Sequence, residues 1–158
     1  SSNTRDFNLE GAGIRAATMN GSYVPNKSFL GTIAYFNGDT ESFTSTSDAD
    51  AESAPNLTQV TGTFSGLRTD NHQVTVTVDS TGTLSVHATD GCTVAGTLSP
   101  WTKGTVFHIS VTFEEGACSQ GSETVTGMAF YDAATHRLYI AALNHARTTS
   151  YLFLGVKQ

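Results

Sequence analysis

The stretch that decides the fold is Phe107-His108-Ile109-Ser110-Val111-Thr112-Phe113, in which apolar and polar residues alternate without a break. A second stretch, Val74-Thr75-Val76-Thr77-Val78, alternates in the same way. Successive side chains of a strand point to opposite faces, so each stretch has one apolar face to bury and one polar face for water. Burial of a single face is typical of antiparallel sheets. The two stretches therefore predict an antiparallel β-protein.

Segments of similar character extend outward from these two in both directions. Turn signals separate them: Asn37-Gly38 and Asp90-Gly91 suit type I′ hairpin turns, and Asp79-Ser80-Thr81-Gly82 suits a type I turn that ends in glycine. We predict an all-β fold, either an antiparallel β-barrel or a two-layer β-sandwich of roughly ten short strands. Besides the two stretches above, the predicted strands cover residues 7–11, 15–24, 29–36, 40–46, 60–67, 83–89, 93–99, 124–131, 137–143 and 150–156.

The composition supports a β-rich fold and bounds its size. Charged residues make up 14% of the chain and hydrophobic residues 38%, both below the usual share, whereas Thr is frequent. Thr favours strands because its branched Cβ suits a pleated surface, and the Lys-rich surface of a typical helical protein is missing. The length of 158 residues fits one domain. We expect a single domain, 1–158, in two layers: a first strand group at 5–46, a connector at 47–56 and a meander at 57–158.

The connector, residues 47–56, is acidic and contains no β-branched residue. We predict a short helix here, two at most, or a surface loop. Its carboxylates at Asp48, Asp50 and Glu52 are weak candidates for a calcium site. Calcium needs more oxygen ligands than this run offers, and a glycine at the tight turn of the loop, which is absent. We therefore predict no metal site.

The charge balance limits the kinds of partner. The net charge is −6 and the eight Lys and Arg residues are scattered, whereas nucleic-acid binding needs clustered cations. The same balance disfavours docking on anionic lipid. No apolar run approaches the length of a membrane-spanning helix, and we predict no spanning segment. The chain begins with Ser1-Ser2-Asn3, so we expect that a targeting segment, or more, has been removed. No cofactor motif occurs, and we expect a monomer.

The two cysteines, Cys92 and Cys118, each follow a glycine-containing turn. They form no Cys-x-x-Cys pair, and no histidine stands beside them at zinc-ligand spacing. A disulfide is the favoured interpretation, and two buried free thiols are the alternative. A disulfide would place the protein in an oxidising compartment such as the periplasm or the cell exterior.

The histidines and hydroxyls form no catalytic signature. No Gly-x-Ser-x-Gly elbow occurs, and we interpret His136 as a polar turn residue. His87 and His108 lie on the polar faces of their strands and would bind a metal only if those strands were neighbours in a suitable register. We therefore predict no catalytic residue and do not expect an enzyme.

Four aromatic residues are candidates for a ligand or surface contact: Trp101, Tyr131, Tyr139 and Tyr151. The alternative for the single tryptophan is a buried anchor at a strand corner. The last predicted strands are apolar on both faces, so we expect them to be central, covered on both sides, or facing a cavity.

Several short motifs together resemble one group of proteins. The group is a family of uncharacterised exported or lipoprotein-type β-rich proteins of β-proteobacteria, and the chain resembles its C-terminal portion. The resemblance implies an envelope location and a cysteine pair matching Cys92 and Cys118, with no assigned activity and no catalytic residues. It rests on Asp6-Phe7-Asn8-Leu9-Glu10-Gly11, Phe43-Thr44-Ser45-Thr46, Gly62-Thr63-Phe64-Ser65-Gly66, Asp90-Gly91-Cys92, Gly116-Ala117-Cys118, Thr126-Gly127-Met128-Ala129-Phe130-Tyr131-Asp132 and Arg137-Leu138-Tyr139.

These observations lead to two hypotheses of different kinds. The first is a non-enzymatic secreted or cell-envelope protein of the periplasm, the outer-membrane surface (as a lipoprotein) or the exterior. Such a protein would be surface-exposed, antigenic and host-facing, with a host or envelope partner that the sequence does not identify. The alternative is a lipocalin-like β-barrel that carries a small apolar ligand.

Overall fold

The computed structural model describes residues 1–7, 14–47, 54–68, 72–102, 104–114 and 116–158. It is all-β, as the sequence predicts, with a single short helix in the described part of the chain. The elements in chain order are β1 (Ser2–Phe7), β2 (Ile14–Val24), β3 (Ser28–Tyr35), β4 (Thr40–Thr46), α1 (Leu57–Val60), β5 (Gly62–Arg68), β6 (Gln73–Val78), β7 (Thr83–Ala88), β8 (Thr93–Pro100), β9 (Val106–Phe113), β10 (Thr124–Asp132), β11 (Arg137–Leu143) and β12 (Ser150–Lys157).

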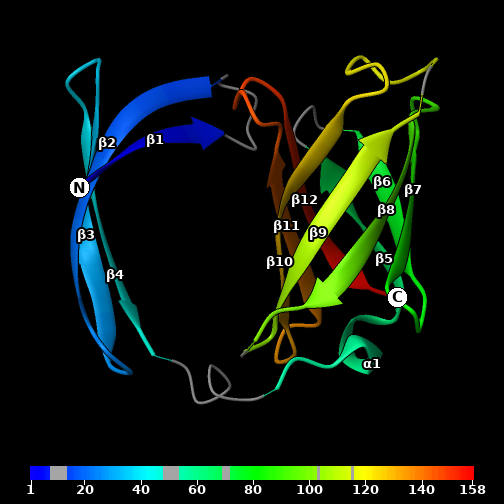
Figure 1. The fold of residues 1–158 in the computed structure, drawn as a ribbon, viewed down its shortest axis with the longest axis horizontal. Helices are drawn as coiled ribbons and strands as arrows, with labels where there is room; N and C mark the ends of the chain where they lie inside the picture. Colours follow the sequence, from blue (N-terminus) through cyan, green and yellow to red (C-terminus); the bar gives the residue numbers. More distant parts are fainter. Residues whose placement is uncertain (8–13, 48–53, 69–71, 103, 115) are drawn as a thin grey trace.

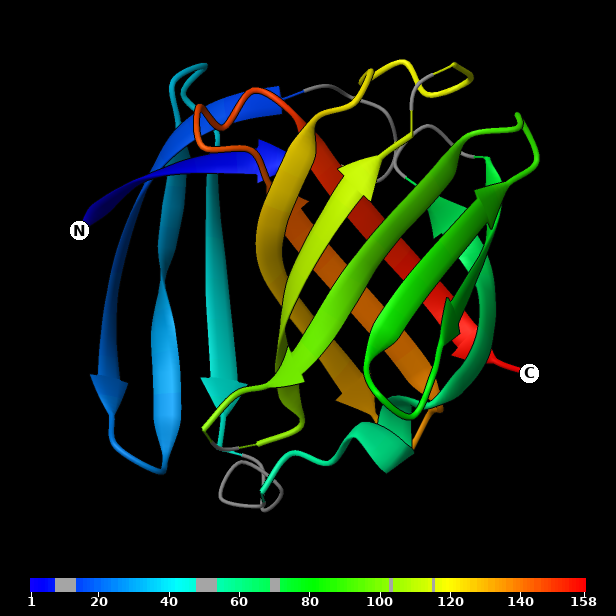
Figure 2. The ribbon, with the colours of Figure 1, turned by 45° about the vertical axis from the view of Figure 1, so that its right-hand side comes forward.

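The strands form two separate sheets. Strands β1 to β4 pair in chain order as an open antiparallel sheet, and β5 to β12 form a closed antiparallel barrel. The barrel closes where β12 pairs with β5, with Leu154 opposite Leu67 and Gly155 opposite Gly66. Figure 1 shows the open sheet on the left and the barrel on the right. Figure 2 shows that the strands that form the barrel wall run obliquely. Of the two predicted architectures, the barrel is therefore the one adopted by the C-terminal strands. That both sheets belong to one domain stays a prediction.

The alternating stretches bury one face in the barrel, as predicted. On β9, Phe107, Ile109, Val111 and Phe113 point inward and are at most 3% exposed, whereas His108 lies on the outside. The inward side chains of all eight strands form one apolar cluster that includes the disulfide sulfurs. An eight-stranded barrel has an interior just wide enough for side chains to fill, and here they fill it.

Both ends of the barrel are covered. At one end α1 places Val60, which is completely buried, against the inward residues, with Leu57 packed beside it. Asn56 caps this helix by accepting a hydrogen bond from the Thr58 N–H at 3.0 Å. At the other end lie the Arg68–Asp90 ion pair and the disulfide. The helix expected around 47–56 thus begins just after that segment, whose residues 48–53 lie outside the described part of the chain.

Glycines at two inward positions let neighbouring strands of the barrel approach closely. A Cβ added at Gly127 would lie 2.0 Å from the Ala141 carbonyl oxygen, and one at Gly96 would lie 2.2 Å from the Ser110 carbonyl oxygen. Because no side chain fits at such a distance, only glycine allows this backbone approach.

The prediction of type I′ turns at Asn37-Gly38 and Asp90-Gly91 is wrong. Gly38 and Gly91 have positive φ values of 95° and 86°, but Asn37 and Asp90 do not, and type I′ requires positive φ at both central residues. The Gly38 and Gly91 N–H groups instead donate to the carbonyls three residues earlier, which makes three-residue loops ending in a glycine. The predicted turn at 79–82 has the same hydrogen bond, with Gly82 at φ 84°.

The first strand also differs from its prediction. It covers Ser2–Phe7, whereas the predicted strand 7–11 lies almost wholly outside the described residues. The other predicted strands are present, with ends that shift by one or two residues. The strand at 40–46 and the strand at 137–143 have the predicted bounds.

Candidate binding surface

The structure separates the four aromatic candidates into two pairs. Tyr131 and Tyr151 point into the barrel and are 4% and 1% exposed, so they belong to its core. Trp101 and Tyr139 lie outside and are 41% and 37% exposed. Tyr131 packs edge-on against Phe64 inside the barrel, with ring centroids 6.0 Å apart. Only Trp101 and Tyr139 therefore remain as surface contacts.

The register of the strands joins these two residues to a larger apolar area. In one row across the barrel wall, His108 on β9 lies opposite Met128 on β10, which lies opposite Ala141 on β11. In the next row, Phe130 lies opposite Tyr139, and Tyr139 lies opposite Leu154 on β12. We name this surface the outer apolar band and define it as Leu67, Trp101, His108, Met128, Phe130, Tyr139, Ala141, Leu152 and Leu154.

Aromatic contacts hold the outer apolar band together. The Trp101 ring lies on the His108 ring, with centroids 3.8 Å apart, and the Phe130 and Tyr139 rings are 6.0 Å apart. Met128 between these pairs is 46% exposed. No member of the band carries a fixed charge. Exposed Trp, Tyr, Phe and Met are enriched at the centres of protein interfaces. The Asp132–Arg137 pair lies at the margin of the band, beside the Phe130–Tyr139 row.

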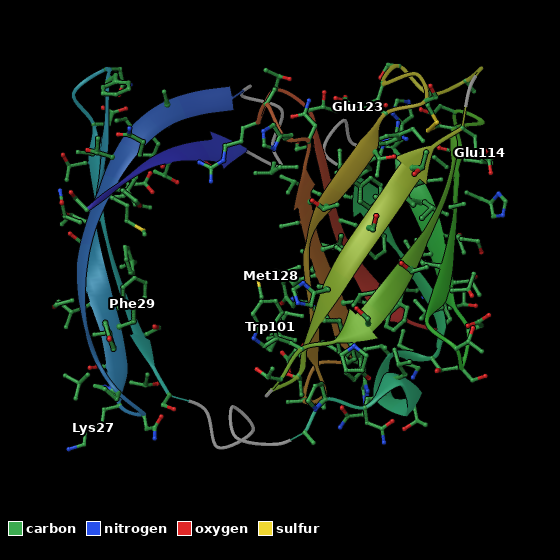
Figure 3. All side chains as sticks on the ribbon, in the orientation of Figure 1. Lys27, Phe29, Trp101, Glu114, Glu123 and Met128 are labelled. Atoms are coloured by element: carbon green, nitrogen blue, oxygen red, sulfur yellow. A yellow bond between two sulfur atoms is a disulfide. The ribbon has the colours of Figure 1, made fainter. Side chains whose placement is uncertain are left out.

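The open sheet also has one apolar face. Residues that pair across antiparallel strands share a face, so Met19 and Ile33 lie together, as do Tyr23 and Phe29. Phe29 and Phe43 also meet there, with ring centroids 4.9 Å apart. Figure 3 shows Phe29 pointing from the sheet toward the barrel, while Trp101 and Met128 point from the barrel toward the sheet.

A small ionisable cluster lies at the polar edge of the apolar face of the open sheet. The Tyr35 hydroxyl donates to the Asp6 carboxylate at 3.0 Å, and the Arg15 guanidinium lies over the Tyr35 ring at 3.9 Å. Burial raises the pKa of Tyr35, and the hydrogen bond to Asp6 and the charges of Asp6 and Glu41 raise it further. The arrangement holds the tyrosine neutral and fixes β1, β3 and β4 together.

The histidines do not come together. His87 on β7 lies opposite Thr93 of β8, whereas His108 on β9 lies opposite Ser99 at the other end of β8. His136 occupies the β10–β11 turn with φ 54°, and its Nδ1 lies 3.2 Å from the Tyr131 hydroxyl. Among the residues that the structure describes, no cluster of metal-ligating side chains is present. The weak calcium candidates Asp48, Asp50 and Glu52 lie outside those residues.

One charged pair was not anticipated from the sequence. The Arg68 side chain is only 5% exposed, points inward at the rim of the barrel and contacts the Asp90 carboxylate at 2.6 Å. Asp90 also accepts a hydrogen bond from the Cys92 N–H at 3.0 Å. That backbone hydrogen bond, together with Arg68, lowers the pKa of Asp90. Arg68 falls on the same face of β5 as Phe64 and Gly66. A charged residue at an inward position is the sequence signal that could have identified this pair.

The predicted disulfide is confirmed. Cys92 and Cys118 are bonded, with Cα atoms 4.6 Å apart, and both are buried. Cys92 directly precedes β8, and Cys118 lies in the loop between β9 and β10, so the bond joins a strand start to the loop after the following strand. It also fixes the turn that carries Asp90.

Comparisons of the chain with family models, with curated proteins and with solved structures found no match. In the part of the chain that the structure describes, no helix has the length and apolar character needed to cross a membrane.

Proposed function

We propose that this protein is an exported, non-enzymatic binding module whose working surface is the outer apolar band. The observation that carries the proposal is the exposure of five residues, each 37–46% accessible, on one side of the barrel. They are Trp101, which directly follows β8, and Leu67, Met128, Phe130 and Tyr139 on β5, β10 and β11. Leaving adjoining aromatic residues in water is unfavourable unless another surface covers them. A binding surface explains why they are there.

The barrel interior favours binding on the outside over carrying a ligand within. A closed barrel is compatible with the carrier alternative, but its interior positions hold Phe64, Phe107, Phe113, Leu138 and Phe153, each at most 2% exposed. Two hollows of about 420 and 520 Å³ lie elsewhere, one on the outer wall of β5 to β7 and one on the open sheet. The apolar outward residues of the last strands thus contribute to the band and not to an internal site.

The partner that fits the band is a protein with an apolar surface of its own. The band lacks the clustered cations that nucleic acid or anionic lipid would require. Its aromatic and methionine side chains provide large contact areas with little polar desolvation. The aromatic pairs Trp101–His108 and Phe130–Tyr139 are the expected centre of the contact.

The export part of the proposal rests on the disulfide. Disulfides form and persist in oxidising compartments and are rare in the cytosol. The resemblance to an exported family of β-proteobacteria is consistent with the same location and is part of the proposal. Antibodies raised against the purified protein should stain intact cells that produce it or detect it in their culture fluid. Detection only after the inner membrane is broken and the cytosol released would contradict export.

Site-specific photo-crosslinking tests the band. The photo-crosslinking residue p-benzoyl-phenylalanine is placed at Met128 in one variant and at Ser85 in a matched control. Ser85 is exposed on β7, on a polar part of the same barrel. The variants are added to the extracellular fluid or cell surface in which the protein occurs and are then irradiated. We expect a discrete adduct with a second protein from position 128 and none from position 85.

Three other outcomes would count against the proposal. An adduct between two copies of the chain would make the band a self-association surface. A crosslink within one chain, from position 128 to the open sheet, would show that the sheet covers the band. Equal adducts from positions 128 and 85 would show that binding is not confined to the band. A competition experiment adds protein without the photo-crosslinking residue to the same fluid. Wild-type competitor should suppress the adduct from position 128, whereas Met128→Arg competitor should leave it undiminished.

A further inference from the structure

The open sheet ends in a strand whose outer edge pairs with no other described strand. The barrel has no edges because it is closed, but β4 pairs only with β3. Natural edge strands usually carry Lys, Pro, a bulge or several charges that prevent pairing with another chain. β4 has the sequence Thr-Glu-Ser-Phe-Thr-Ser-Thr, with Glu41 as its one charge. This edge is therefore open to strand addition.

Hydrogen bonds at both ends of the β3–β4 pair show which backbone groups of β4 are available. The Tyr35 N–H donates to the Asp39 carbonyl at 2.9 Å, and the Ser47 N–H donates to the Lys27 carbonyl at 2.8 Å. Hydrogen-bonded pairs alternate along an antiparallel ladder, so odd-numbered residues of β4 bond to β3. The N–H and C=O groups of Ser42 and Thr44 then point away from β3, to the free edge.

We propose that β4 pairs antiparallel with β4 of a second copy of this chain, with Phe43 opposite Phe43 at the two-fold axis. A two-fold interface requires a surface that complements itself, and β4 reads nearly the same in both directions around Phe43. The pairing places Ser42 opposite Thr44 and Thr40 opposite Thr46. These are the pairs whose backbone groups point outward, so the ladder forms in this register without any change in β4.

The side chains suit this register. The two Phe43 rings face each other in a pair that is not hydrogen-bonded, where side chains approach most closely. Ser and Thr pairs across strands form favourable hydroxyl contacts. Each Glu41 lies opposite Ser45 and not opposite the second Glu41, so the one charge of the strand is not placed against its copy. β1, at the other edge, has no such symmetry, because Arg5 and Asp6 interrupt it.

The dimer would join two open sheets into one continuous eight-stranded sheet. Phe29 and Phe43 of both copies would lie side by side on its apolar face, which shields part of that face from water. The sequence alone led us to expect a monomer, because edge complementarity becomes visible only when the strand order is known. This inference does not depend on the proposed function, since β4 contributes nothing to the outer apolar band.

Sedimentation equilibrium of the purified full chain tests the proposal. We expect a reversible monomer–dimer equilibrium for the wild type up to millimolar concentration. In Ser42→Lys/Thr44→Lys, each new Lys lies opposite the other Lys of the second copy, and dimerisation should weaken roughly tenfold or more at low salt. The control Asn20→Lys/Ser22→Lys adds the same charge to exposed positions of β2, on the same face but away from the edge. It should dimerise like the wild type.

Mixing opposite charges separates an edge contact from a general charge effect. Ser42→Glu/Thr44→Glu should also fail to dimerise alone, but an equimolar mixture with the Lys variant should form a heterodimer. Thr44→Pro removes an outward N–H and leaves the β3 ladder intact, so it should give a folded monomer. A wild type that stays monomeric throughout the concentration range would overturn the proposal. Equal dimerisation of the edge variant and the β2 control, or no heterodimer in the mixture, would also overturn it.

Discussion

The disulfide supplies a large and separable part of the stability of the barrel. Cys92 and Cys118 enclose a loop with a sequence separation of 26. In the chain-entropy model, closing a loop of this length lowers the entropy of the unfolded chain by about 12 cal/mol/K, which amounts to about 3.5 kcal/mol at 25 °C. We therefore expect the reduced protein to be less stable than the oxidised protein by this amount.

Urea unfolding followed by the fluorescence of Trp101 measures the effect. Trp101 is the one tryptophan of the chain and lies on the barrel, so the signal reports the barrel and not the open sheet. With a denaturant slope of about 2 kcal/mol/M, the midpoint should fall by between about 1 and 2 M on reduction. The slope should increase, because the unfolded chain without the crosslink exposes more surface.

A matched variant separates the crosslink from the packing of its sulfurs. Cys92→Ala/Cys118→Ala removes both, and since the sulfurs are buried it should cost about 1–2 kcal/mol more than reduction alone. Treatment with a reducing agent should leave this variant unchanged. A loss of less than about 1 kcal/mol on reduction would refute the entropic reasoning. Thiols that react in the native, unreduced protein would refute the disulfide itself.

Three further perturbations follow from the barrel. Asp90→Asn removes the carboxylate that contacts Arg68 at the rim and should cost about 2–4 kcal/mol in urea unfolding. This is less than for a fully buried pair, because Asp90 is 23% exposed. Folding lowers the pKa of Asp90, so its charged carboxylate stabilises the folded protein at pH values above the ordinary pKa of 3.8. This stabilisation is lost as the pH falls below that value. Acid titration of stability should show a smaller loss in Asp90→Asn than in the wild type, and equal losses would contradict this. Gly127→Ala, whose Cβ would meet the Ala141 carbonyl, should cost about 1–3 kcal/mol or more in thermal unfolding, whereas an unchanged melting temperature would show that the wall can yield. Val60→Ala should open a cavity at the helix-covered end and lower stability by about 1–3 kcal/mol, and a neutral result would mean that α1 does not seal the barrel.

Strand positions were predictable because their signal is local. The alternation in 74–78 and 107–113 specifies which residues are inward without reference to any other strand. The disulfide was predictable because both cysteines stand at turns and no other pairing exists for them. Barrel and sandwich were not distinguishable, since both have the same two-residue period. Closure depends on the pairing of β12 with β5, which lie far apart in the sequence.

The candidate site was only half predictable for a related reason. β11 and β12 are apolar on both faces, and β10 contains the unbroken apolar run Met128 to Tyr131, so alternation alone did not separate the inward Tyr131 and Tyr151 from the outward Tyr139. Met128 and Phe130 were not selected, because their surface role appears only when the register places them beside His108 and Tyr139. The prediction of the turn type at Asn37-Gly38 was wrong because the same dipeptide fits a two-residue and a three-residue loop. The register of the flanking strands decides between the two.

The two proposed surfaces lie on different sheets, and this has a consequence for binding. A dimer formed through the edge of β4 would not use the outer apolar band of either barrel, because β4 contributes no residue to that band. Each dimer would then carry two bands linked by a continuous sheet. On a surface that carries many partner molecules, binding of one band to a partner holds the second band near other partners and raises its effective concentration there. Two weak contacts then give strong attachment. A filled and crosslinked barrel suits this role, since its interior stays rigid and the binding surface lies wholly outside.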